Sequence, residues 1–307
     1  MDSEPRIDIH GRAGRAGWVW PDSGRSFRVS CLPAVSVAPA VDSIHGVSGS
    51  FYVPLGEGRW RATEHTTGPW DPRAQHGGPP SALLGRAIER CDPRDDMVIA
   101  RFTCEILGAI PVGELDLRAR VIRPGRSVEL VEAAAHAGGR DVASARAWRV
   151  RRAESPSVPA RLAPPPELPA ESIERPPRGW VDGYLSAIEW RPVKGEFGAL
   201  GPASVWSRLR YPLVPDEEVS PLQRVLTVAD SGNGLSGQLD ITEWQFINPE
   251  LTVHLHREAA GEWILVDAST TITAGGAGLA SAALSDRQGP VGVGAQSLLI
   301  TRRPVAR

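Results

Sequence analysis

The chain has 307 residues, of which 41% are hydrophobic and 23% are charged, and its formal net charge is -2. This composition is typical of a globular protein with one large domain or two moderate ones. The nearly balanced charge gives no electrostatic reason to expect binding to nucleic acid or to an anionic membrane surface.

The three cysteines are few and scattered. Cys31, Cys91 and Cys104 show no CxxC spacing, which argues against both a disulfide framework and a structural zinc site. We therefore expect a protein of the reducing cytoplasm. No run of 18 apolar residues occurs, so we expect no helix that spans a membrane.

Residues 1–46 differ from the rest of the chain. They are rich in Gly, Pro, Ser and Arg and follow neither a period of 2 nor one of 3.6 residues. This pattern predicts a disordered extension, or a start codon assigned too early.

The next segment, residues 47–152, predicts strands around one helix. A helix from Pro79 to Arg90 follows the glycines of Gln75-His76-Gly77-Gly78, and prolines suit a first helical turn. The predicted strands are Phe51–Leu55, Arg59–His65, Val98–Leu107, Glu114–Ile122, Ser127–His136 and Val142–Arg151. The short turns between them indicate antiparallel neighbours.

The same order recurs after a connector. Residues 153–179 contain eight prolines and cannot continue a sheet or a helix. Residues 180–304 then predict a helix that begins at Ser220-Pro221, within strands over 183–190, 204–210, 244–246, 251–256, 263–273, 278–284 and 297–302. A duplicated unit of strands around one helix is the tandem hotdog arrangement, an α+β fold.

The helix of the second half carries an aspartate at its end. At helical spacing, Leu222, Val225, Leu226 and Ala229 form one apolar stripe, and Asp230 falls at the margin of that stripe. Burying a carboxylate costs several kcal/mol unless something compensates the charge. Asp230 is therefore either a helix-end residue that reaches solvent or a catalytic carboxylate.

Five motifs, in order, resemble the double-hotdog thioesterase-like superfamily, which includes acyl-CoA thioesterases of type II. They are Gln75–Ala87, Arg120–Arg126, Ala229–Gly234, Phe246–Val253 and Gln296–Leu299, and the resemblance covers about residues 48–304. It implies two antiparallel sheets, each wrapped around a central helix, and hydrolysis of an acyl-CoA or acyl-carrier thioester. Such a hydrolysis requires no cofactor or metal, and the resemblance also leads us to expect a homo-oligomer.

The resemblance further implies a catalytic set in the second half. The positions that match the family's water-orienting residues are Asp230, Asn248 and Gln296. Asn248 stands where the family has a hydroxyl residue, although an amide can both donate and accept a hydrogen bond. Thr252, four residues further on, is the alternative hydroxyl. Asp230 would take a proton from the attacking water or orient it.

The start of the first helix offers groups for the substrate oxygen. Backbone N–H groups at a helix start are free donors, and Gly77 and Gly78 would allow close approach, so they are candidates for an oxyanion hole. His76 beside them is a candidate for substrate binding, or it only caps the helix.

Other readings stay open. Asn248-Pro249 also suits a simple turn, and Gln296 a satisfied buried amide. Arg123 and Arg126 flank a turn and could meet a CoA phosphate or only be solvated. Three tryptophans could line an acyl pocket or pack in a core: Trp70, Trp206 and Trp244.

Two functional alternatives remain. No GxSxG motif occurs, which disfavours a serine hydrolase. The alternative to an enzyme is a non-catalytic acyl-CoA or lipid-binding protein, or a scaffold, that has kept the fold and lost turnover.

Overall fold

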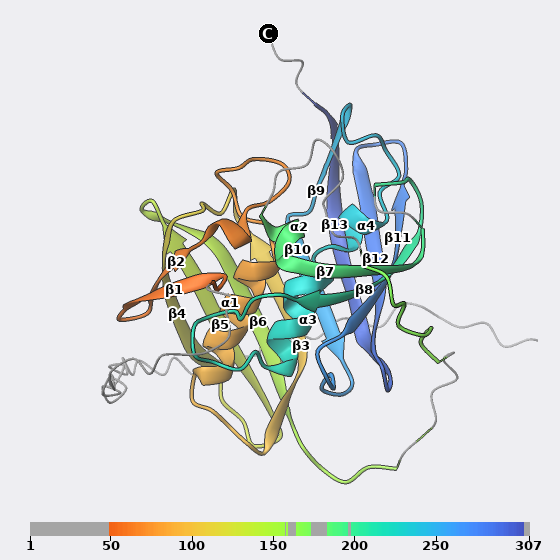
Figure 1. Ribbon diagram of the computed structural model, residues 1–307. Helices are drawn as coiled ribbons and strands as arrows, with labels where there is room; N and C mark the ends of the chain where they lie inside the picture. Colours follow the sequence, from red (N-terminus) through yellow and green to blue (C-terminus); the bar gives the residue numbers. More distant parts are fainter. Residues whose placement is uncertain (1–48, 157, 159–163, 173–182, 196–197, 304–307) are drawn as a thin grey trace, which may run out of the picture. The chain divides into compact units, whose positions relative to one another are not determined.

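The computed structural model describes residues 49–156, 158, 164–172, 183–195 and 198–303. The predicted extension over residues 1–46 lies outside this part, as do sections of the connector over 153–179. The boundaries of the two halves therefore remain predictions. The protein has two central helices and a long antiparallel sheet (Figure 1).

The first half contains six strands and the helix α1 (Gly78–Arg90). Pro79 and Pro80 occupy the first turn of α1, where the missing N–H groups of proline leave no hydrogen bond unmade. The strands are β1 (Tyr52–Gly56), β2 (Arg59–Ala62), β3 (Met97–Ile106), β4 (Glu114–Arg123), β5 (Val128–Ala137) and β6 (Arg140–Arg151), with a 3-10 turn η1 (Glu64–Thr66) after β2.

The second half repeats this pattern around α3 (Pro221–Ala229). A capping box starts α3: Ser220 accepts from the Gln223 N–H while the Gln223 side chain accepts from the Ser220 N–H. Its other elements are the short helices α2 (Tyr184–Ala187) and α4 (Gly232–Leu235) and the strands β7 (Ile188–Lys194), β8 (Ala203–Leu209), β9 (Trp244–Ile247), β10 (Glu250–Leu255), β11 (Ile264–Ile272), β12 (Ala277–Asp286) and β13 (Gly289–Arg302).

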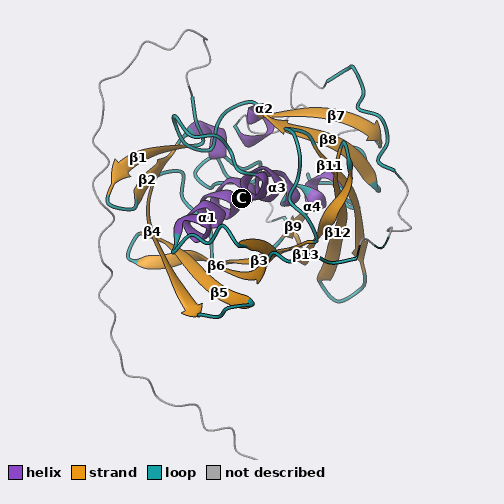
Figure 2. Cartoon of the chain, turned by 90° about the horizontal axis from the view of Figure 1, so that it is seen from below, coloured by secondary structure: helices purple, strands orange, loops and turns teal. Residues whose placement is uncertain are grey.

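The strands of both halves join into one sheet. Its order is β1-β2-β4-β5-β6-β3-β10-β13-β12-β11-β8-β7, with β9 paired to β13. The halves meet where β3 pairs with β10 in antiparallel register, with Thr103 opposite Thr252. The predicted two sheets are thus continuous with each other. Figure 2 shows this sheet curving around α1 and α3, which lie together inside it.

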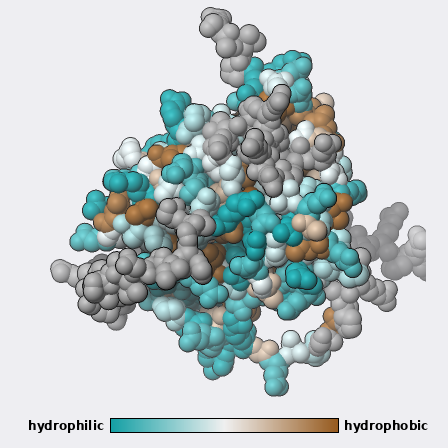
Figure 3. Space-filling view, viewed as in Figure 1, coloured by the Kyte–Doolittle hydropathy of each residue, from teal (hydrophilic) through white to brown (hydrophobic). Residues whose placement is uncertain are grey.

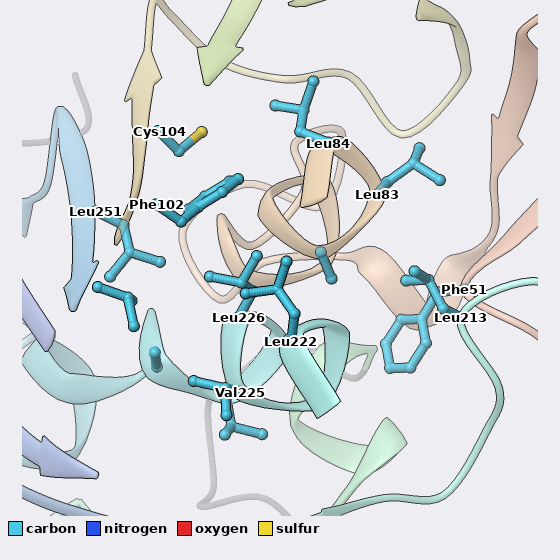
Figure 4. Close-up of a cluster of buried hydrophobic side chains, with 14 of the residues drawn as sticks. Phe51, Leu83, Leu84, Phe102, Cys104, Leu213, Leu222, Val225, Leu226 and Leu251 are labelled. Carbon is cyan, nitrogen blue, oxygen red and sulfur yellow. The ribbon is translucent and has the colours of Figure 1, made fainter. Parts of the chain in front are cut away.

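The two central helices pack directly on each other. The predicted stripe of α3 is confirmed, since Leu222, Val225, Leu226 and Ala229 are each at most 6% exposed. Figure 4 shows Leu222 and Leu226 in the core between α1 and α3. Gly85 of α1 permits the close approach, because a Cβ there would lie 2.6 Å from a methyl carbon of Leu226.

A separate buried cluster contains two tryptophans. Trp206, Trp263 and Leu265 form a buried cluster under Leu168 of the connector. Trp206 therefore packs in a hydrophobic cluster, as in the second of the two alternatives that the sequence left open. Elsewhere the face seen in Figure 3 is mainly hydrophilic, with apolar residues in small separate groups. Among the helices of the described residues, none is long and apolar enough to cross a membrane.

Candidate active site

Asp230 is the residue that ends α3. It caps the helix C-terminus, and the chain then turns through Ser231 into α4. The apolar stripe of α3 draws the helix end into the core, so Asp230 is only 3% exposed. The two readings of Asp230 are thereby separated, since the carboxyl does not reach solvent.

Two side-chain amides hold one oxygen of this carboxyl. Asp230 Oδ1 accepts a hydrogen bond from Asn248 Nδ2 at 2.8 Å and another from Gln296 Nε2 at 3.0 Å. Gln296 also donates to the Asp230 backbone carbonyl at 2.9 Å. The structure therefore brings together three residues that lie on α3, in the turn between β9 and β10, and on β13.

Asn233 joins the two amides from the first turn of α4. Its backbone N–H donates to Gln296 Oε1 at 3.0 Å, and its Nδ2 lies 3.4 Å from Asn248 Oδ1. Both amides thus have their orientation fixed by Asn233. The sequence motif that contains Asp230 also contains Asn233, but nothing in the sequence assigned it a role.

The other oxygen of the carboxyl faces the first half of the chain. Asp230 Oδ2 lies 3.4 Å from His76 Nδ1. A Cβ on Gly77 would lie 2.6 Å from the same oxygen, so only glycine leaves room for this carboxyl. The start of α1 therefore forms a wall of the site in the second half.

His76 is held as a neutral ring. Its Nδ1 accepts a hydrogen bond from the Gly78 N–H at 3.1 Å, and burial lowers the pKa of His76 to about 3. Nδ1 then carries a lone pair and Nε2 carries the proton. The Tyr184 ring stacks on the imidazole, with centroids 3.8 Å apart and 7° between the planes. The Tyr184 hydroxyl donates to the Thr227 carbonyl at 2.8 Å, which fixes the stack.

Burial also controls the charge of Asp230. It raises the pKa of Asp230 to about 7, while hydrogen bonds from Asn248, Gln296 and the Gly77 backbone pull the pKa down. The nearby Glu250 carboxylate adds a smaller upward shift to that pKa. At neutral pH the carboxyl is therefore present both with and without its proton, as suits a group that takes up and releases protons.

Comparison with known proteins gives the context for this geometry. Residues 66–150 match the acyl-CoA thioesterase N-terminal domain, and residues 159–300 match the acyl-CoA thioesterase C-terminal domain. The chain belongs to the acyl-CoA thioesterase family. This family comprises thioester hydrolases, and the predicted double-hotdog fold is confirmed.

Solved structures share the fold of this thioesterase family member. An acyl-CoA thioesterase II from Mycobacterium marinum has a TM-score of 0.59 at 18% identity, covering 83% of this chain and 96% of that one. A conserved protein of unknown function with a hot dog fold from Alicyclobacillus acidocaldarius has a TM-score of 0.64 at 15% identity, covering 82% of this chain and 96% of that one. No curated protein sequence matches the chain.

The oxyanion hole predicted at Gly77 and Gly78 of this thioesterase family member remains a prediction. The Gly78 N–H donates to His76 Nδ1, and the Gly77 backbone lowers the pKa of Asp230 by hydrogen bonding. In this arrangement both glycine amides are committed within the protein. The two glycines also allow α1 to lie close to Asp230 and to the Thr227 carbonyl.

Thr252 is not part of the group around Asp230. Its neighbours Leu251 and Val253 are both fully buried, so Thr252 points to the opposite face of β10. There its hydroxyl donates to Glu250 Oε2 at 3.0 Å and lies 3.2 Å from Thr103 Oγ1. The prediction of Thr252 as the alternative hydroxyl is therefore corrected.

One cysteine lies within electrostatic range of Asp230 but does not supply a nucleophile. Cys104 on β3 is 1% exposed, and burial raises the pKa of its thiol to about 12. A thiol that stays protonated at neutral pH is a poor nucleophile. The Cys104 thiol is therefore no candidate for the nucleophile.

Proposed function

We propose that the protein hydrolyses an acyl-CoA thioester with Asp230 as the general base. The observation that carries this proposal is the asymmetry of the carboxyl. Oδ1 accepts hydrogen bonds from two amides, whereas Oδ2 faces His76 and Gly77 at the start of α1. With a pKa of about 7, Asp230 can accept a proton at Oδ2 at neutral pH.

The reaction then has two steps. A water attacks the thioester carbonyl carbon as its proton passes to Asp230 Oδ2, which gives a tetrahedral intermediate. When the intermediate collapses, the C–S bond breaks and the proton moves from Asp230 to the departing sulfur. The products are a carboxylic acid and CoA, and Asp230 returns to its carboxylate form.

Asn248 and Gln296 contribute to this mechanism through Asp230. Both donate to Oδ1, so they stabilise negative charge on the carboxyl and leave Oδ2 on the side of His76 and Gly77. The oxygen of each amide faces Asn233, so both are committed to the network. Their role differs from the water binding expected from the family resemblance.

His76 is the group we assign to the substrate oxygen. Its Nδ1 is occupied by the Gly78 N–H, so its proton resides on Nε2. The His76 side chain is 12% exposed. A neutral Nε2–H can donate to a thioester carbonyl as negative charge develops there.

Thiol release from a panel of acyl-CoAs tests the proposal. We expect turnover by the wild type, loss of turnover of about 10³-fold or more in Asp230→Asn, and a smaller loss in Gln296→Ala. Asp267→Asn is the control, since this aspartate is exposed on β11. Unchanged turnover in Asp230→Asn would show that another group activates the water.

The same measurements address the non-catalytic alternative. Asn248 favours it, because this amide replaces the hydroxyl residue of the family and is fully occupied by Asp230, Asn233 and the Glu250 carbonyl. Tight binding of acyl-CoA with no thiol release on any chain length would establish a binding protein instead of an enzyme.

A further inference from the structure

One face of β13 runs from the candidate active site to a cationic end. Alternate residues of a strand share a face, so four side chains lie on the same side of β13: Gln296, Leu298, Ile300 and Arg302. The first three are buried and Arg302 is exposed. Because a strand rises about 3.4 Å per residue, Arg302 stands roughly 20 Å along β13 from Gln296.

Two arginines at this end are held against aromatic rings. The Arg302 guanidinium lies 4.8 Å from the ring centroid of Trp244, and that of Arg303 lies 5.3 Å from the ring centroid of Trp70. In the part of the chain that the structure describes, neither guanidinium forms an ion pair. Arg303 Nε is buried there without a hydrogen-bond partner. Both cations can therefore receive an anion.

An open cavity lies beside Gly234 of α4 and Phe246 of β9. Its volume is about 190 Å³, and its side-chain walls include Leu239, Ile241 and Phe246. Phe246 connects the two ends: its backbone carbonyl accepts from Asn233 at 3.3 Å, and its ring meets Trp70 edge-on at 5.1 Å. Gly234 and Gly237 line the same cavity without side chains.

We infer that this surface binds the CoA half of the substrate, with the phosphates of its nucleotide end on Arg302 and Arg303. The inference rests on the proposed function and adds the position of CoA. The pantetheine arm separates the thioester from the phosphates, and the cavity beside Phe246 provides its path. Trp70 and Trp244 offer aromatic faces near those phosphates, where the adenine can stack.

The alternative basic turn of the sequence fits CoA less well. Arg123 donates to the Val128 carbonyl at 2.9 Å and lies over the Trp148 ring at 5.5 Å, on the β4–β5 hairpin of the first half. The acids near Arg303 do not neutralise it: Asp240 accepts from Thr242, and Glu243 contributes its backbone carbonyl to the Arg303 N–H.

Binding of CoA, pantetheine and 3′,5′-ADP by the full chain tests the inference by calorimetry. We expect CoA to bind the wild type more tightly than pantetheine, and 3′,5′-ADP to bind by itself. The double variant Arg302→Ala/Arg303→Ala is expected to lose CoA affinity by roughly tenfold per arginine, since a charge-assisted contact is of that order. Its affinity for pantetheine should not change.

Two control variants distinguish a folding defect from the loss of a contact with CoA. Arg287→Ala removes an exposed arginine from the turn at the other end of β13 and should leave all three affinities unchanged. The double variant Arg302→Lys/Arg303→Lys keeps the charge and should retain part of the preference for CoA. Equal binding of CoA and pantetheine by the wild type, or equal weakening of both in the alanine variant, would overturn the inference.

Turnover separates this inference from the proposed function. Thiol release from acyl-CoA and acyl-pantetheine with the same KM would leave the hydrolase standing and refute the CoA site. Conversely, a preference for CoA that depends on the arginines, without thiol release from either thioester, would uphold the site and refute hydrolysis.

Discussion

Replacing Asp230 by asparagine should abolish activity and stabilise the fold. Asparagine can accept from Asn248 and Gln296 through its oxygen, as Oδ1 of Asp230 does. Its NH₂ group can face His76 Nδ1, which already accepts from the Gly78 N–H. The substitution therefore keeps the hydrogen bonds from Asn248 and Gln296, loses an acceptor for the Gly77 N–H, and removes a carboxyl whose charge is costly to bury.

The size of the effect follows from the pKa of this carboxyl. Burial raises the pKa of Asp230 from 3.8 to about 7. Below pH 3.8 the carboxyl is protonated in both the folded and the unfolded chain. As the pH rises from 3.8 to about 7, the carboxyl of Asp230 loses its proton in the unfolded chain but keeps it in the folded chain. The free energy of unfolding of the wild type therefore falls over this range, and it falls no further above about pH 7. About three pKa units correspond to about 4 kcal/mol.

Urea unfolding of both proteins at pH 4, 6 and 8 measures this difference. We expect the free energy of unfolding of Asp230→Asn, minus that of the wild type, to grow by up to about 4 kcal/mol from pH 4 to pH 8. The titration of His76 largely cancels, since both proteins contain it. Asp267→Asn, on the surface of β11, serves as the control for loss of one charge. A difference that stays constant across this range would refute the argument.

Three further outcomes are expected. The kcat/KM of the wild type should rise with pH through about 7 and then level off, because the carboxylate of Asp230 is the base; a pH–rate profile that falls over this range would contradict that role. Gly77→Ala should lower activity and should lower the free energy of unfolding by about 1–3 kcal/mol, because its Cβ would meet Asp230 Oδ2. Gly113→Ala, which has open space around it, should change neither quantity when both variants are compared by thermal unfolding and thiol release. Tyr184→Phe should keep most activity because the ring still stacks on His76, and Tyr184→Leu should lose it; equal kcat values for the two variants would mean that the stack does not position His76.

The sequence by itself determined the local features around Asp230. The 3.6-residue spacing of Leu222, Val225 and Leu226 defined a buried helix face, and Asp230 followed at its margin. Short turns predicted antiparallel strands, and the repeat of one order in both halves predicted the double hotdog. The motifs containing Asn248 and Gln296 could be found because the resemblance preserves their order along the chain.

Only the tertiary structure decided which distant residues are in contact. His76 and Asp230 lie 154 positions apart in the sequence, and they meet because α1 and α3 pack against each other. Tyr184 gave no local signal, since its role depends on stacking across the two halves. Periodicity also cannot show which acceptor a backbone N–H finds, and in the structure the Gly78 N–H donates to His76 Nδ1. Packing alone fixes such contacts, because they join segments whose spacing along the chain is arbitrary.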